Sequence, residues 1–195
     1  MMALTRYDFY KIQGNRKNKD KVELYRFKNE FKDIYIVEIF HYDFNVYAIK
    51  FYLKNHSDSK KRYNICYKAE FKKNLGFETG NSNFIKVLNT ILSIVIEIRK
   101  KDELASFGFM GAPKESEADP EVNSSNINLD CTVADTKRYR VYHLYTRKYF
   151  NPSDFEYIDS KSSSILLLRN NKNKETLTKD VAENYIINTI IPSLT

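Results

Sequence analysis

The stretch IYIVEIFHYDFNVYAIKFYLK (residues 34–54) decides the fold class of this chain. β-Branched and aromatic residues fill residues 34–42 and 46–54, a composition that is typical of strands. Only Asp43, Phe44 and Asn45 separate the two runs, and a gap of three residues suits a hairpin loop. The stretch therefore predicts two neighbouring antiparallel strands.

The second run alternates between apolar and basic positions. Its apolar face consists of Tyr47, Ile49, Phe51 and Leu53. Lys50 and Lys54 fall on the opposite face, and YNICYKAEF (residues 63–71) alternates in the same way. We therefore expect a sheet with one solvent-exposed, basic face.

A further hairpin is expected near the N-terminus. YDFYKIQ and VELYRF flank GNRKNKDK (residues 14–21), which predicts a basic hairpin tip that carries Arg16, Lys17 and Lys19.

The period of the apolar residues changes after Ser82, from two to that of a helix. The apolar positions are Phe84, Val87, Leu88, Ile91, Ile94, Val95 and Ile98. Asn89 and Thr90 fall on the opposite side, and Asn81 or Ser82 could serve as N-cap. The β-branched content leaves a buried strand as the competing interpretation, which the length disfavours.

The second half adds further elements. Residues 107–112 predict a short central strand, residues 113–135 a long mobile acidic loop, and FEYID with SILLLRN a hairpin. Residues 176–191 predict a final amphipathic helix that ends before Pro192. The order of elements indicates a single α+β domain, with a mixed, mainly antiparallel sheet and about three helices packed on one face.

Charge is unevenly distributed along the chain. The net charge is +7, yet residues 102–135 hold eight acids and one lysine. A basic body attracts phosphate backbones or acidic protein surfaces, and an acidic segment must repel the former or fold back onto the body. Lysines that only keep an ordinary surface soluble would explain a scattered distribution of lysine. They explain less well why the acidic residues are gathered in one segment and the basic residues elsewhere.

Several classes of function lack their sequence signals. No apolar run is long enough to span a membrane, and the first residues do not resemble a secretory signal, so we expect a cytoplasmic protein. Cys66 and Cys131 lie far apart and share no metal-ligand spacing with the three histidines. Phosphate-binding glycine motifs and a nucleophile elbow are absent. We expect neither a cofactor nor a metal.

TKRYRVYHLYTRKYF (residues 136–150) predicts a helix that begins after Asp135 or Thr136. Helical spacing brings Tyr142, Tyr145 and Tyr149 to one side, which we expect to pack on the sheet. Arg140, His143 and Arg147 fall on another side.

The start of this helix is a candidate anion site. Lys137, Arg138 and Arg140 lie in the first turns, where free N–H groups and the helix dipole already favour a negative charge. Either the neighbouring acidic loop or an external phosphate or carboxylate could supply that charge. The candidate binding residues of the whole chain are Lys137, Arg138, Arg140, His143, Arg147, Lys148, Arg16, Lys17, Lys19, Lys50 and Lys54.

NFIKVLNTI (residues 83–91), followed by TKRYRVY (residues 136–142) and then by RKYF and DFEYI, resembles an uncharacterised family of small bacterial and phage proteins. That family has a K-V-L-x-T helix and an R-x-R-L-Y helix leading to an aromatic strand. The matching positions are Lys86, Val87, Leu88, Thr90, Arg138, Arg140 and Tyr142. The chain departs from the family by its acidic insertion and by lacking a small-residue pair before the Arg motif. The resemblance implies an α+β fold and no particular chemistry.

Three hypotheses on function follow. The first is a non-enzymatic protein whose basic surface binds nucleic acid or a nucleoprotein, such as a phage or mobile-element inhibitor of a nucleic-acid-guided nuclease. The second is a small nuclease that uses Arg138 with His143, or Asp58 with Glu70 and Lys72. The third is a protein-binding module whose contact is the acidic loop.

Overall fold

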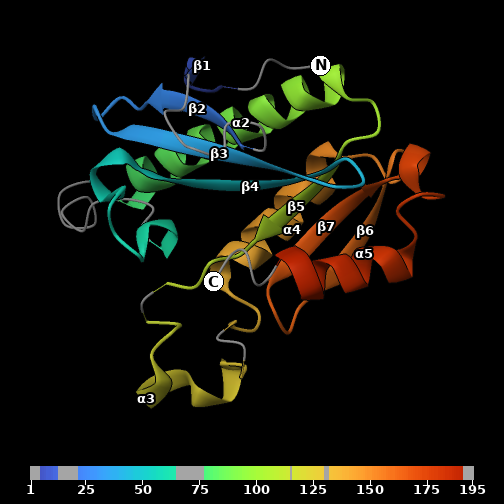
Figure 1. Ribbon diagram of the computed structural model, residues 1–195. Helices are drawn as coiled ribbons and strands as arrows, with labels where there is room; N and C mark the ends of the chain where they lie inside the picture. Colours follow the sequence, from blue (N-terminus) through green and yellow to red (C-terminus); the bar gives the residue numbers. More distant parts are fainter. Residues whose placement is uncertain (1–4, 13–21, 65–76, 115, 130–131, 191–195) are drawn as a thin grey trace. The chain divides into compact units, whose positions relative to one another are not determined.

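The computed structural model of the protein describes residues 5–12, 22–64, 77–114, 116–129 and 132–190 (Figure 1). Seven strands follow the hydrogen-bonded order β1-β2-β3-β4-β5-β7-β6. The pairs β1–β2, β2–β3, β5–β7 and β6–β7 are antiparallel, whereas β4–β5 is parallel. The predicted α+β class with a mixed, mainly antiparallel sheet is confirmed.

The chain groups into two compact units. Unit 1 comprises Met1–His41 and Ile49–Lys101, and unit 2 comprises Tyr42–Ala48 and Asp102–Thr195. The division falls within β3 and β4, so each of these strands contributes residues to both units.

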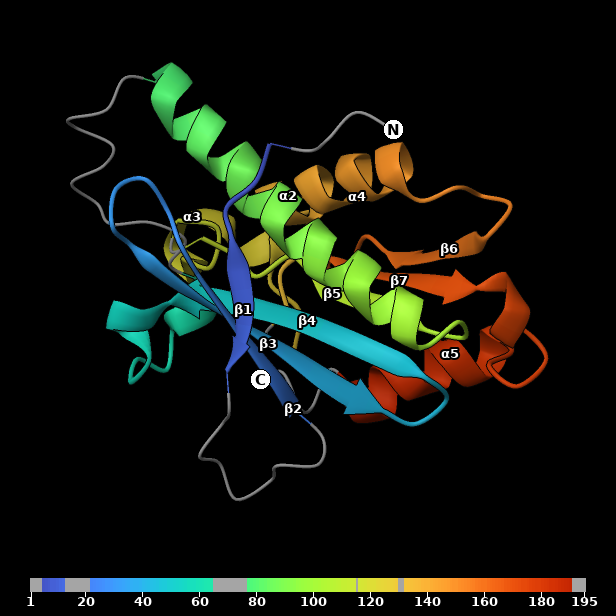
Figure 2. The same ribbon diagram turned by 90° about the horizontal axis from the view of Figure 1, so that it is seen from above.

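Unit 1 contains β1 (Phe9–Ile12), β2 (Val22–Lys28), most of β3 (Ile34–Tyr42), the end of β4 (Val46–Leu53) and α2 (Phe77–Lys101). Figures 1 and 2 show α2 lying along these strands. Strands β3 and β4 have the predicted bounds to within one residue. Phe44 and Asn45, in the predicted hairpin loop, adopt positive φ angles of 58° and 55°, the backbone that tight hairpin turns require.

Helix α2 is longer and more deeply buried than predicted. It begins at Phe77, so neither Asn81 nor Ser82 is its N-cap. The predicted apolar positions Val87 through Ile98 are buried, but Asn89 and Thr90 are buried too. The N-terminal segment covers them: the Tyr7 N–H donates to Thr90 Oγ1 at 3.0 Å, and Asn89 Nδ2 donates to the Thr5 carbonyl at 2.7 Å.

Among the described residues of the predicted basic sheet face, Lys50 is not fully exposed. Lys50 is half-buried, with its Nζ 4.8 Å from the ring centroids of both Phe40 and Tyr63. A 3₁₀ turn, η2 (Arg62–Asn64), supplies Tyr63 and therefore covers this face. Lys54 is exposed, at the start of η1 (Lys54–His56).

Some predictions fall on residues that the structure does not describe. The predicted strand at residues 63–71 begins in η2, and its remainder lies outside the described residues. The same holds for the predicted basic tip with Arg16, Lys17 and Lys19, and for Cys66 and Cys131.

Unit 2 is a helix–sheet–helix sandwich. Its elements are β5 (Ser106–Met110), α4 (Lys137–Tyr149), β6 (Phe155–Ser160), β7 (Ile165–Asn170) and α5 (Lys179–Tyr185). Ala182 and Ile186 pack with Ile158, Ile165 and Leu167 on one face. Helix α4 lies on the other face (Figures 1 and 2). The helices of this unit therefore cover both faces of the strands rather than the single face that was predicted.

The acidic segment has local structure, although it was predicted as a loop. It contains α3 (Pro120–Asn123), with Asp119 as N-cap, and the 3₁₀ turn η3 (Ser124–Asn126). An isolated bridge pairs Ile127 with Val133 and closes the segment before α4.

Candidate nucleic-acid interface

The start of α4 is fixed by hydrogen bonds to the residue that follows β5 and to the residue that precedes β7. Thr136, one of the two predicted candidates, is the N-cap: its Oγ1 accepts from the Tyr139 N–H at 3.2 Å and donates to the Gly111 carbonyl at 2.6 Å. The Thr136 N–H donates to Ser164 Oγ at 2.9 Å. A Cβ on Gly111 would lie 2.4 Å from the Tyr139 nitrogen, so only glycine permits this close approach.

This anchoring sets which side of α4 is buried. The buried residues are Arg138, Tyr139 and Thr146, whereas the predicted tyrosines at 142, 145 and 149 are only half-buried. The Tyr139 hydroxyl donates to Asp159 Oδ2 at 2.7 Å, and burial together with this carboxylate raises the pKa of Tyr139. With tyrosines at four positions of the helix, the sequence pattern did not reveal which of them pack on the sheet.

Arg138 is not available to an external anion. Its side chain is 6% exposed, and Nη1 donates to the Ala112 carbonyl at 3.1 Å. Arg138, which was predicted as a binding residue, is thus turned toward the end of β5 by the Thr136 anchor. The Arg138–His143 nuclease pair loses its arginine for the same reason.

The anion at the start of α4 comes from the chain itself. Glu117 Oε1 accepts from the Lys137 N–H at 2.8 Å, and Glu117 Oε2 accepts from the Lys114 N–H at 2.9 Å. Asp135 contacts Arg140, with Nη1 to Oδ2 at 3.3 Å. The acidic segment thus occupies the predicted phosphate position, and of the two alternatives it is the intramolecular one that the structure contains.

A basic stripe remains on the outward side of α4. We define the α4 stripe as its exposed residues, which are Lys137, Arg140, Leu144, Arg147 and Lys148. Within the described part of the chain, Asp135 is the only carboxylate that forms a salt bridge with a side chain of this stripe, and it is shared with Lys161. The cationic groups of Arg147 and Lys148 lie over the rings of Tyr157 and Tyr149, at 5.7 and 5.3 Å from the centroids.

The rings beside the stripe form a half-buried aromatic flank. Tyr145 and Tyr149 have ring centroids 4.8 Å apart, and the pKa of Tyr145 is raised by burial and by Tyr149. His143 is half-buried, and its ring centroid lies 5.8 Å from that of Tyr139. Proteins that bind single-stranded nucleic acid combine cations, which bind phosphates, with aromatic rings, on which bases stack.

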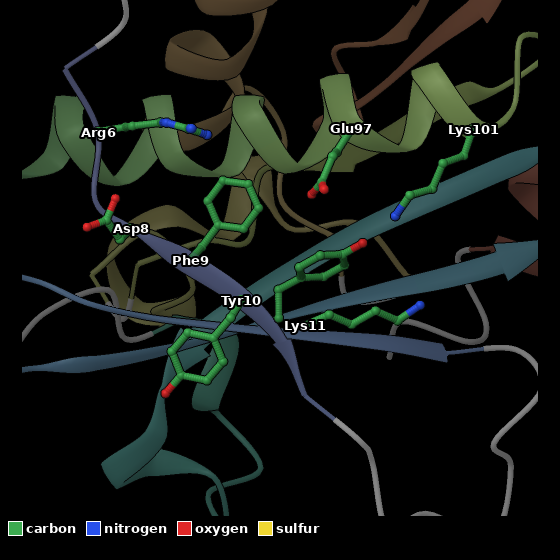
Figure 3. Close-up of a pocket in the computed structure, with 8 residues that line it drawn as sticks. Arg6, Asp8, Phe9, Tyr10, Lys11, Glu97 and Lys101 are labelled. Carbon is green, nitrogen blue, oxygen red and sulfur yellow. The ribbon is translucent and has the colours of Figure 1, made fainter.

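Unit 1 has a cleft that was not predicted from the sequence. It has a volume of about 320 Å³ and is lined by residues of β1, of the stretch before β1, of β2 and of α2 (Figure 3). The lining residues are Arg6, Asp8, Phe9, Tyr10, Lys11, Tyr25, Glu97 and Lys101. Lys11 Nζ lies 2.9 Å from Glu23 Oε2. The other two cations that line the cleft, Arg6 and Lys101, are matched by two lining acids, Asp8 and Glu97. This balanced charge does not suit a polyanion.

Positive charge is concentrated in unit 1. That unit has 21 Lys+Arg against 10 Asp+Glu, a net of +11, whereas unit 2 has 11 against 15, a net of −4. The α4 stripe is therefore a local basic surface on an acidic unit.

The second predicted nuclease site consisted of Asp58, Glu70 and Lys72. Asp58 lies exposed in a turn, while Glu70 and Lys72 lie outside the described residues.

The chain matches no protein-family model, no curated protein and no solved structure. Its resemblance to small bacterial and phage proteins stays a prediction. Among the described residues, no helix has both the length and the apolar character to cross a bilayer. Nor do three or more His, Cys, Asp or Glu side chains there come together as metal ligands would.

Proposed function

We propose that the protein binds nucleic acid through the α4 stripe. The observation that carries the proposal is that four of the five exposed residues of α4 are cations, on a helix that contains no acid. Arginine and lysine at the spacing of one helix face can follow a phosphate backbone, and Tyr145 and Tyr149 lie beside them for stacking. Unit 1, with its net charge of +11, adds long-range attraction.

The proposal differs from the one made on sequence alone. Arg138 is buried, so the proposal uses four of the other predicted binding residues, which are Lys137, Arg140, Arg147 and Lys148. A nucleoprotein also exposes phosphates that the α4 stripe could contact. The same surface therefore suits a phage or mobile-element protein that inhibits a nucleic-acid-guided nuclease.

Salt dependence and paired substitutions test the proposal. Fluorescence anisotropy with labelled single-stranded RNA and DNA should show affinity falling steeply between about 50 and 200 mM salt. The double variant Arg147→Gln/Lys148→Gln should reduce the slope of log K against log salt by about 1.4, as expected for two lost single-strand phosphate contacts.

Matched controls separate the stripe from net charge. Lys174→Gln/Lys179→Gln removes two exposed cations elsewhere in unit 2 and should leave the slope unchanged. Lys60→Gln/Lys61→Gln removes two exposed cations of unit 1. Loss of binding in either control pair, with the α4 pair unaffected, would overturn the assignment to α4.

One observation favours a second function, protein binding by the acidic segment. Val122 is 73% exposed and Leu129 is fully exposed, and both lie among acids. Apolar anchors within an acidic surface suit a basic protein partner. A partner that copurifies with the wild-type chain and with Arg147→Gln/Lys148→Gln, but not with Val122→Ser/Leu129→Ser, would establish this function.

A further inference from the structure

A cluster of charged and aromatic side chains lies on β3, β4 and η2 of unit 1. Its members are Glu38, Phe40, Lys50, Tyr52, Arg62 and Tyr63. Glu38 is fully buried, and its carboxylate accepts from the Tyr63 hydroxyl at 2.5 Å and from the Tyr52 hydroxyl at 3.4 Å. Arg62 Nη2 donates to the Tyr63 hydroxyl at 2.8 Å. Groups of this kind gathered in a half-buried place are candidates for chemistry.

Lys50 is the nucleophilic group of this cluster. Its Nζ lies 4.8 Å from the ring centroids of Phe40 and Tyr63, so two rings displace the water that would solvate an ammonium. Burial lowers the pKa of Lys50 to about 8; Glu38 opposes this shift and the positive charge of Arg62 adds to it. A desolvated lysine beside a second cation is the arrangement that gives a reactive amine at neutral pH.

We propose that Lys50 forms an imine with a small aldehyde that carries a carboxylate. The amine lone pair attacks the carbonyl carbon, a C–N bond forms, and the carbonyl π electrons move to oxygen. The two amine protons and that oxygen leave as water, so the products are one imine and one water. Arg62, which also contacts Tyr63, is the neighbouring cation for the carboxylate. This inference concerns unit 1 alone and does not depend on nucleic-acid binding.

Trapping with glyoxylate tests the proposal on the wild-type chain. Limiting glyoxylate and cyanoborohydride convert each imine into a stable secondary amine, which peptide mass spectrometry assigns to individual lysines. At pH 7.5 the amine of Lys50 should be modified at least about tenfold faster than those of Lys60 and Lys61, because a larger fraction of it is unprotonated. Its rate should level off above pH 8, whereas the rates of the exposed lysines should keep rising.

A variant and an unfolded control connect the result to the cluster. Arg62→Gln removes the neighbouring positive charge and should move the midpoint of the Lys50 profile to higher pH. In the urea-unfolded chain, Lys50 should lose its advantage over Lys60. Modification of Lys50 no faster than of Lys60 in the folded protein, or a rate still rising at pH 9.5, would overturn the proposal.

Discussion

Glu117 holds the N-terminus of α4, with its Oε1 2.8 Å from the backbone nitrogen of Lys137. A carboxylate at this place stabilises the first turn through the helix dipole, and it also puts negative charge beside the α4 stripe. The acidic segment is thus both a cap for α4 and a competitor for any phosphate that approaches the start of the helix.

Glu117→Gln should raise the affinity for nucleic acid. Glutamine keeps an oxygen that can accept from the Lys137 N–H, but it removes the charge and the oxygen that accepts from the Lys114 N–H. We expect affinity to rise about two- to fivefold at low salt, corresponding to roughly 0.3–1 kcal/mol for one charge near a helix end. Anisotropy titrations measure this. Glu121→Gln, an exposed acid of α3, is the control; an equal rise in both variants would mean that only net charge matters.

Arg138 should matter for stability rather than for binding. Arg138→Met leaves the Ala112 carbonyl without its guanidinium donor and should lower the free energy of unfolding by about 1–3 kcal/mol. Arg140→Met, at a half-exposed side chain, should cost less than about 1 kcal/mol and should weaken nucleic-acid binding instead. Urea unfolding and anisotropy of both variants distinguish the two roles. The reverse pattern would contradict the assignment.

The contact of Gly111 with α4 predicts a large difference between two glycine substitutions. In Gly111→Ala the new methyl group would lie 2.4 Å from the Tyr139 nitrogen and 2.5 Å from Thr136 Oγ1, so α4 must shift. We expect destabilisation by about 1–3 kcal/mol or more. Gly108→Ala is the matched control, because its methyl group would meet nothing closer than the Tyr47 carbonyl oxygen at 3.9 Å. Similar thermal midpoints for the two variants would show that α4 is not anchored at Gly111.

The pKa of Lys50 predicts how stability changes with pH. Between pH 8 and about 10 the unfolded chain binds the Lys50 proton and the folded chain does not, so the contribution of this group to stability increases with pH. Below pH 8 both states are charged, and the folded state bears the cost of burial. Urea midpoints at pH 7.5 and 9.5 should therefore rise more, or fall less, in the wild type than in Lys50→Met. An identical change in both proteins would show that the pKa of Lys50 is ordinary.

Local patterns determined the secondary structure of most described elements. Alternation of apolar and basic residues predicted β4, because a strand with a buried face shows a period of two in its own sequence. β-Branched and aromatic composition predicted β3, and the runs FEYID and SILLLRN predicted the hairpin of β6 and β7. The helical period defined the centre of α2, and a threonine before a basic stretch defined the start of α4. The net positive charge and the separate acidic segment were likewise visible in the composition.

Only the tertiary structure decided which charged groups remain accessible. Nothing near Arg138 in the sequence shows that it binds the Ala112 carbonyl, or that Glu117, 20 positions before Lys137, caps α4. The same holds for Lys50. Its alternation with apolar neighbours predicted an exposed side chain, but Tyr63 of η2 lies against it. Periodicity reports the two sides of an isolated element, whereas burial and charge pairing depend on what other segments bring to each side.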